Sequence, residues 1–175
     1  RFALRWLPPL GFNNSYVLAV SKAGHTGALH TISDLAARSG QMVAAFDFEF
    51  AERKDGYAGL KKAYGMKFAR VVDMHPDLMY TALKRGEVDV ISAYATDGRL
   101  AQPDLVRLED DRHFFPPYEA AIVVREDALA KHPGLAPSLS ALSGTLTDER
   151  MRAANAAVDR GKSSIEQAAA LLLKE

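Results

Sequence analysis

The sequence predicts a mixed α/β protein that has one complete lobe and part of a second. Between residues 12 and 97, short apolar runs alternate with helical segments of about ten residues. After residue 98 this alternation stops, and four helical segments are accompanied by only two apolar runs, too few for a sheet layer of their own. We therefore assign residues 12–97 to a complete α/β lobe. Residues 1–11 and 98–175 are assigned to hinge crossings and the C-terminal part of the other, incomplete lobe.

Four strands are expected in the first lobe, because four short apolar runs are each bounded by glycine or polar turn residues. They span residues 16–20, 42–46, 68–72 and 88–92. Strands that alternate with helices imply crossover connections, so we expect a largely parallel sheet.

Three helices are expected between these strands, at residues 31–39, 56–64 and 76–85. Thr31 can cap the first helix, while Asp34 can accept hydrogen bonds from its exposed backbone amides. Gly65 follows the second helix, where a left-handed C-cap is favoured. Pro76 is suited to the first position of the third helix, because its missing N–H would be unpaired there in any case.

The remainder of the chain is expected to contain two strands, an extended connector at residues 114–118 and four helices. The strands span residues 105–108 and 120–124, and the helices span residues 126–132, 135–142, 147–159 and 163–174. Because two strands supply too little sheet for four helices, these elements would expose apolar faces. We therefore expect a swapped or intertwined homodimer, or poor order in this part. A monodisperse, fully ordered monomer in light scattering would contradict this expectation.

Composition excludes several classes of function. The 22 lysines and arginines balance 22 aspartates and glutamates, so no bulk positive charge favours nucleic acid as a partner. No apolar run reaches the roughly 18 residues of a membrane-spanning helix. The absence of cysteine excludes disulfides and thiolate chemistry. Glycine-rich phosphate loops are also lacking, and we expect no cofactor.

The histidines do not indicate a metal site. None of the five is separated from another by the three or four positions that place two ligands on one helix face. They are better interpreted as surface or capping residues: His25, His30, His75, His113 and His132.

An acidic cluster follows the expected strand at residues 42–46. Asp47, Glu49 and Glu52 lie where open α/β sheets place their ligand crevices. Two carboxylates at a suitable separation could catalyse hydrolysis, but the same residues are also typical of a solvated loop with a charged helix start. Both interpretations stay open on the residues alone.

Three tyrosines give a sharper signal, because each lies at the boundary of an expected element. Tyr16 begins the first strand, Tyr94 follows the strand at residues 88–92, and Tyr118 follows a double proline. At such positions the polar-tipped rings can face a cleft. Taken singly, each tyrosine is also compatible with half-buried packing.

A series of motifs, in this order, resembles one known family. The motifs are Gly11-Phe-Asn-Asn-Ser-Tyr16, Thr31-Ile-Ser-Asp-Leu35, Phe48-Glu-Phe50 with Arg53 and Asp55-Gly-Tyr57, Gly59-Leu-Lys-Lys-Ala-Tyr-Gly65, Gly86-Glu-Val-Asp-Val90, Ala93-Tyr-Ala-Thr-Asp-Gly-Arg99 and Leu108-Glu-Asp-Asp-Arg-His-Phe-Phe-Pro-Pro-Tyr118. Together they resemble the substrate-binding protein of osmoprotectant ABC transporters. That family takes up glycine betaine, choline, carnitine or related quaternary ammonium compounds.

The resemblance implies a fold and a location. Family members have the type II periplasmic-binding-protein fold, a two-lobed Venus flytrap. They are periplasmic, lipid-anchored or fused to the permease, which implies a periplasmic or extracytoplasmic, membrane-associated location and an ABC permease as partner. The family's chain begins well before the first residue of this one, and the earlier stretch carries half of the other lobe with a further tyrosine.

The resemblance also implies a ligand site. Tyr16, Tyr94 and Tyr118 match the family's box of tyrosines, which holds the cationic head group. Asn14 matches a polar position beside the first tyrosine, and Arg53 lies near the position that contacts the ligand carboxylate in some members. The chemistry agrees, because a quaternary ammonium donates no hydrogen bond and must be recognised by aromatic faces. A betaine carboxylate would need a guanidinium or an amide, whereas choline would need neither.

Three functions follow, of which the first is our leading hypothesis. The chain captures a small quaternary ammonium osmolyte by lobe closure and delivers it to a permease, without catalysis. In the second, the same fold binds another zwitterion, such as ergothioneine. In the third, an enzyme on a two-lobed scaffold uses Asp47, Glu49 or Glu52 as acid and base. Carboxamide substitution would abolish turnover in an enzyme, whereas Tyr94→Ala or Tyr118→Ala would weaken a binding protein.

Overall fold

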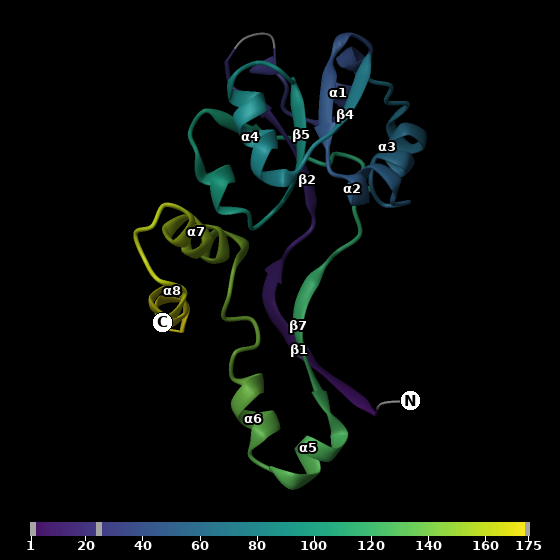
Figure 1. The fold of residues 1–175 in the computed structure, drawn as a ribbon. Helices are drawn as coiled ribbons and strands as arrows, with labels where there is room; N and C mark the ends of the chain where they lie inside the picture. The colour runs from purple at the N-terminus through teal and green to yellow at the C-terminus, as the bar shows by residue number, and fades with distance from the viewer. Residues whose placement is uncertain (1–2, 24–25, 174–175) are drawn as a thin grey trace.

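The computed structural model describes residues 3–23 and 26–173, in which the strands form two separate sheets (Figure 1). A five-stranded sheet has the order β4-β3-β5-β2-β6, and a two-stranded sheet pairs β1 with β7. The strands are β1 (Leu4–Asn13), β2 (Tyr16–Ser21), β3 (Val43–Phe46), β4 (Arg70–Asp73), β5 (Val90–Tyr94), β6 (Leu105–Arg107) and β7 (Glu119–Arg125). His25, interpreted above as a surface or capping residue, lies outside the described residues.

One group of helices lies, along the chain, among the strands of the larger sheet, and a second group comes after β7. Those of the first lobe are α1 (Ile32–Arg38), α2 (Phe48–Glu52), α3 (Tyr57–Tyr64) and α4 (Pro76–Lys84), with 3₁₀ turns η2 (Ser39–Gln41) and η3 (Gly98–Ala101). The later helices are α5 (Glu126–Lys131), α6 (Leu135–Ser140), α7 (Asp148–Asp159) and α8 (Ile165–Leu172). None of the helices in the described part of the chain is long and apolar enough to cross a lipid bilayer.

Local signals placed the expected helices close to their observed ends, although the short helix α2 was not expected. Thr31 accepts a hydrogen bond from the Asp34 amide, and the Asp34 side chain accepts one from the Thr31 amide, so both halves of the capping box are present. Gly65 ends α3 with φ of 66° and ψ of 21°, the left-handed conformation expected there. Pro76 occupies the first turn of α4.

The larger sheet is mixed, so the expectation of a largely parallel sheet was wrong. Strand β3 runs parallel to β4 and β5, but β2 runs antiparallel to β5 and β6. The reason is that β2 carries the chain into the lobe from β1, whereas β5 carries it back toward η3 (Figure 1). Two such strands, when they are neighbours, must run in opposite directions.

Strand β6 pairs with the first lobe, although the sequence assigned it to the second. Ala19 of β2 lies opposite Arg107, and Val20 lies opposite Val106. Residues 105–107 thus extend the larger sheet at its edge before the chain leaves through the connector. The division of the chain into two lobes stays a proposal, in which the first lobe gains this strand.

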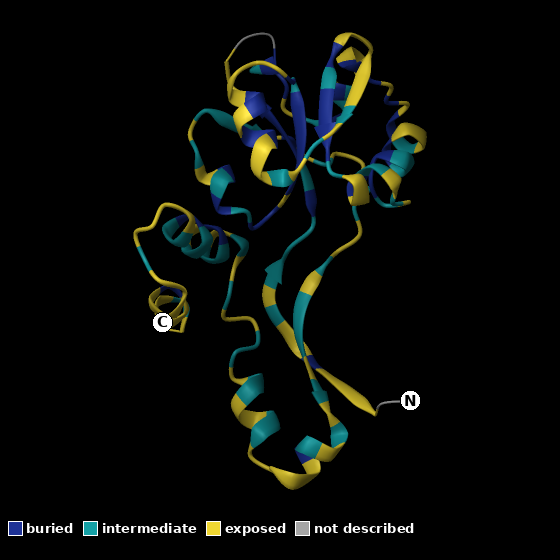
Figure 2. Cartoon of the chain, viewed as in Figure 1, coloured by how far each residue is buried: buried dark blue, intermediate teal, exposed yellow. Residues whose placement is uncertain are grey.

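Alternation along the strands builds an apolar cluster on each face of the larger sheet. On one face Leu18, Val20 and Phe46 pack with residues of α1 and α3. On the other face Ala19 and Ile91 pack with residues of α4. Neighbouring residues of one strand therefore enter opposite clusters, as the two-residue period requires, and the first lobe has a complete core (Figure 2).

Strand β1 was not expected, because Pro8 and Pro9 interrupt it. It nevertheless pairs antiparallel with β7, from Leu4 opposite Arg125 to Asn13 opposite Glu119. The register shifts on both sides of Pro9, as expected for a residue that cannot donate a ladder hydrogen bond. The pair forms a long ribbon that joins the first lobe to α5 and α6 (Figure 1).

The ribbon and α8 leave large apolar side chains exposed, as the sequence predicted for the second part of the chain (Figure 2). Trp6 on β1 and Ile165 on α8 are each 71% exposed. Other exposed side chains are Leu4, Val123, Leu171 and Leu173. Association into a homodimer through these faces stays a prediction.

Helix α7 is fixed to the point where the chain enters and leaves the first lobe. Arg152 Nε donates to the Ala95 carbonyl at 2.9 Å, and Asn155 Nδ2 donates to the Thr96 carbonyl at 2.8 Å. The contact is close, because a Cβ built on Gly98 would lie 2.3 Å from the Ala156 nitrogen. A glycine is therefore required where η3 meets α7.

Gly98→Ala should destabilise the protein by about 1–3 kcal/mol, because the added methyl group must push α7 away from η3. Gly40→Ala is the matched control, since a Cβ at Gly40 meets nothing within 4 Å. The control should be neutral or slightly stabilising. Urea denaturation of both variants measures the difference, and equal free energies of unfolding would contradict the close contact.

Candidate functional site

The three predicted tyrosines converge at one end of the larger sheet. Tyr16 and Tyr94 are directly paired, because β2 begins where the antiparallel β5 ends. Tyr118 approaches from the residue before β7, and its carbonyl accepts a hydrogen bond from the Asn14 amide at 3.1 Å. Its own amide donates to Asn13 Oδ1 at 2.7 Å. Two reciprocal contacts thus hold Tyr118 beside the start of β2.

Tyr16 is the centre of an aromatic cluster. Its ring stacks on Tyr94 with centroids 5.0 Å apart and an angle of 28° between the planes. Tyr118 lies edge-on at 6.2 Å, and Phe50 and Phe115 lie at 4.9 and 6.2 Å. Tyr16 is only 5% exposed whereas Tyr94 is 40% exposed. In this conformation Tyr94 covers the ring of Tyr16 and presents the open aromatic surface.

The hydroxyl groups of this pair face the same side. The Tyr16 and Tyr94 oxygens lie 3.4 Å apart, within hydrogen-bond distance. Burial, followed by this contact with Tyr94, raises the pKa of Tyr16 well above its ordinary value. Tyr16 therefore stays neutral at physiological pH.

Arg53 lies beside the tyrosines and is held by two carboxylates. Its Nε and Nη2 atoms donate to the two oxygens of Asp55, both at 2.8 Å, and Nη1 donates to Glu49 Oε1 at 2.9 Å. Nη2 also donates to the Tyr118 hydroxyl at 2.9 Å, and that hydroxyl donates to Asp55. Arg53 reaches this position because it caps the end of the short helix α2.

This network changes the ionisation of its members. Hydrogen bonds from Arg53 and then from Tyr118 hold the pKa of Asp55 far below its ordinary value. The hydrogen bond to Asp55, together with burial, raises the pKa of Tyr118. Asp55 is therefore a carboxylate and Tyr118 a neutral phenol throughout the neutral pH range.

The guanidinium of Arg53 also lies near two aromatic rings. Its Cζ is 5.9 Å from the centroid of Tyr16 and 5.9 Å from that of Tyr118. These distances are at the outer limit of a cation–π contact. The edge of the tyrosine cluster can therefore accommodate a positive group.

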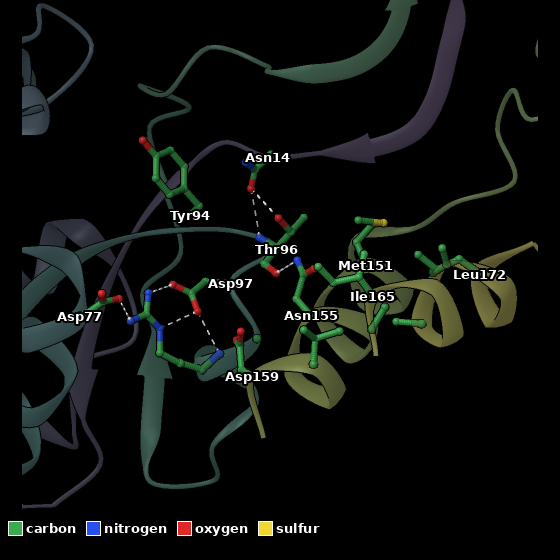
Figure 3. A pocket seen from close by; sticks show the side chains of 16 residues that line it. Asn14, Asp77, Tyr94, Thr96, Asp97, Met151, Asn155, Asp159, Ile165 and Leu172 are labelled. Atoms are coloured by element: carbon green, nitrogen blue, oxygen red, sulfur yellow. Dashed lines mark hydrogen bonds and ion pairs between the residues drawn. The ribbon is translucent and has the colours of Figure 1, made fainter. Parts of the chain in front are cut away.

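Asn14, the other predicted polar residue, turns toward Thr96 (Figure 3). Its Oδ1 accepts a hydrogen bond from Thr96 Oγ1 at 2.6 Å and one from the Thr96 amide at 3.4 Å. These bonds tie the chain entering the first lobe to the chain leaving it. Asn14 has a structural role here, beside any contact it makes with a ligand.

Three of the predicted residues line two hollows on the protein. Asn14 and Tyr94 line a cavity of about 760 Å³ that extends to α7 and α8 (Figure 3). Tyr16 and Tyr94 line a smaller one of about 140 Å³, together with Asp47, Ser92 and Asp97 among others. Tyr118 and Arg53 line neither of these two. Asp97 and Arg99 line both hollows as well, and Tyr94 is the only one of the predicted binding residues that does so.

The sequence reasoning missed several residues of this site. Phe50 and Phe115 pack against Tyr16, Asp55 binds Arg53 and Tyr118, and Thr96 holds Asn14. The Arg53–Asp55 pair had a local signal, since the two residues are two positions apart. The other contacts join residues more than thirty positions apart, for which the local sequence offers no signal.

The acidic residues after β3 mostly serve the fold. Asp47 caps α2 by accepting a hydrogen bond from the Phe50 amide at 2.9 Å, and Glu49 forms an ion pair with Arg53. Glu52 is exposed at the end of α2. Among residues 3–23 and 26–173, no group of three or more histidine or acidic side chains is arranged to hold a metal ion.

Replacing Asp55 should affect stability in a pH-dependent way. Its folded-state pKa lies below the ordinary value of about 3.9, so its stabilising contribution is present above that value and is lost as the pH falls through the folded pKa. Urea denaturation near pH 7 should show Asp55→Asn to be less stable than the wild type. Near pH 3 the two free energies should lie closer together, and an unchanged difference would contradict the network.

Comparison with known proteins identifies the family. The model of the substrate-binding domain of the ABC-type glycine betaine transport system matches residues 1–175. A solved structure described as a glycine betaine/carnitine/choline ABC transporter has a TM-score of 0.82 and 37% identity, over 98% of this chain and 64% of that one. The periplasmic-binding-protein fold expected from the sequence is thereby confirmed.

Curated relatives differ in the ligand they are named for. The carnitine transport binding protein OpuCC of Listeria monocytogenes serotype 1/2a (strain 10403S) is 37% identical over 161 residues, which are 91% of this chain and 52% of the relative. An ergothioneine transport permease/ergothioneine binding protein, EgtU of Helicobacter pylori (strain G27), is 37% identical over 164 residues, 93% of this chain and 30% of that protein. The chain thus spans about half the length of OpuCC and less of EgtU.

A substrate-binding domain binds its ligand without converting it. The hypothesis that Asp47, Glu49 and Glu52 act as catalytic acids or bases is therefore wrong. The matched family model, the fold and the tyrosine cluster agree with one another. The chain belongs to the family of substrate-binding domains of ABC-type glycine betaine transport systems.

Proposed function

We propose that this chain binds a small quaternary ammonium osmolyte for uptake by an ABC transporter. The observation that carries the proposal is the convergence of three tyrosines, with Tyr94 and Tyr118 within about 6 Å of the Tyr16 ring. The proposed binding residues are Tyr16, Tyr94, Tyr118, Asn14 and Arg53.

The chemistry of the ligand supports this assignment. A quaternary ammonium carries its charge on methyl groups and donates no ordinary hydrogen bond, so aromatic faces are its best partners. Each such contact contributes about 0.5–2 kcal/mol once water is removed. Tyr94 must turn away from Tyr16 for a ligand to reach both rings, because the two are stacked. Binding is therefore expected to rearrange Tyr94.

Another zwitterion, such as ergothioneine, is the second candidate. It is favoured by the similarity to the Helicobacter pylori protein, whose name includes ergothioneine binding. A trimethylated nitrogen and a carboxylate are common to ergothioneine and carnitine, so the same aromatic cluster suits both.

We further propose how the domain acts in transport. Closure about the two chain crossings, near residues 8–14 and 97–105, would bring the second lobe over the tyrosines. The loaded domain would then deliver its ligand to a membrane permease from a periplasmic or other extracytoplasmic position. This role in transport is that of the family of substrate-binding domains to which the chain belongs.

Isothermal titration of the chain with glycine betaine, choline and carnitine tests the proposal. At least one ligand should give saturable heat, and Tyr94→Ala should weaken its binding by roughly tenfold or more through loss of the ring. Tyr94→Phe is the matched control, because it keeps the aromatic face and removes only the hydroxyl; it should retain most of the affinity. Equal affinity of Tyr94→Ala and the wild type would contradict the role of the cluster, and absence of binding to all three would contradict the proposed ligands.

A further inference from the structure

We infer that Asp55 is a specificity-determining residue, which makes the tyrosine site select a quaternary ammonium alcohol such as choline over a quaternary ammonium carboxylate such as glycine betaine. The inference rests on the proposed function of the same site. It concerns the group of the ligand that lies next to Arg53, rather than the ammonium itself.

Asp55 takes up the donors that a ligand carboxylate would need. A guanidinium has five N–H donors, and a carboxylate is bound best by two of them in parallel. Four of the five on Arg53 are already donated: two to Asp55, one to Glu49 and one to the Tyr118 hydroxyl. Asp55 holds the bidentate position itself, with two bonds of 2.8 Å. A ligand carboxylate would find one donor at most.

The charge of the group also disfavours a carboxylate. Arg53 contributes one positive charge, and its two partners Asp55 and Glu49 contribute one negative charge each, so the three carry a net charge of −1. Two like charges about 4 Å apart repel by several kcal/mol where water is partly excluded, and by about 1 kcal/mol in bulk water. The same net charge attracts a cation. The group therefore favours a ligand that is positive and has no anionic tail.

A hydroxyl suits this environment better than a carboxylate. It can donate to a carboxylate oxygen of Asp55 or Glu49 and can also accept from the remaining Arg53 donor. Tyr118 shows the same chemistry within the protein, since its hydroxyl accepts from Arg53 and donates to Asp55. A ligand alcohol would repeat that arrangement.

Titration calorimetry with choline and glycine betaine tests the inference in the wild-type chain and in Asp55→Asn. The wild type should bind choline roughly tenfold more tightly or better, which corresponds to about 1.4 kcal/mol. Asp55→Asn should shift the affinity ratio toward glycine betaine by roughly tenfold, because it frees Arg53 donors and removes one negative charge. Glu52→Gln is the control: it removes an equal charge from the end of α2, in the segment just before Asp55, and Glu52 makes none of the Arg53 hydrogen bonds.

The outcomes separate this inference from the proposed function. Binding of glycine betaine as tight as that of choline by the wild type overturns the inference and leaves the proposed function in place. If the ratio of choline to glycine betaine affinity shifts equally in Glu52→Gln and Asp55→Asn, the selectivity does not depend on the hydrogen bonds of Asp55. Binding of neither ligand overturns the inference, and titration with carnitine then decides the proposed function. Circular dichroism verifies folding of the variants, and the wild-type ratio decides alone if Asp55→Asn does not fold.

Discussion

The antiparallel pairing of β2 with β5 is the contact on which the rest of the structure depends. It brings the chain into the first lobe and out again on neighbouring strands, and it sets Tyr16 directly opposite Tyr94. The same pairing places Asn14 within reach of Thr96, so the segment that enters the larger sheet and the segment that leaves it are bonded to each other. A shift of the β2–β5 register by one residue would turn Tyr16 to the opposite face of the sheet and separate it from the other rings of the cluster. One strand register therefore fixes both the tyrosine cluster and the bond between these two segments.

The positive charge beside the aromatic rings is compensated by neighbouring carboxylates. Arg53 lies near Tyr16 and Tyr118, but its charge is more than balanced by Asp55 and Glu49. A free arginine here would repel a ligand cation from the very rings that should bind it. Its carboxylate partners turn the same position into one that tolerates a cation. If the proposed function holds, electrostatic balance would select ligands here as much as aromatic surface does.

The two parts of the chain differ in how they are stabilised. The first lobe has apolar clusters on both faces of its sheet, whereas the ribbon of β1 and β7 has no further strand beside it among the described residues. Helix α7 is bonded to the carbonyls of Ala95 and Thr96, just after β5, rather than to that ribbon alone. The position of α7 therefore follows the first lobe, whereas the ribbon and α8 keep large apolar side chains exposed.

The sequence by itself determined most helices and strands, but not α2, because most of these elements depend on residues a few positions apart. The capping box of Thr31 with Asp34 and the left-handed Gly65 needed no distant partner. It also identified the tyrosines, since they stand at the ends of apolar runs. Only the tertiary structure decided three features. These are the mixture of parallel and antiparallel strands in the larger sheet, the pairing of β1 with β7 in spite of Pro8 and Pro9, and the hydrogen bond from Tyr118 to Asp55, 63 positions away. Those features depend on free energies of contact between segments far apart in the chain, which no local pattern records.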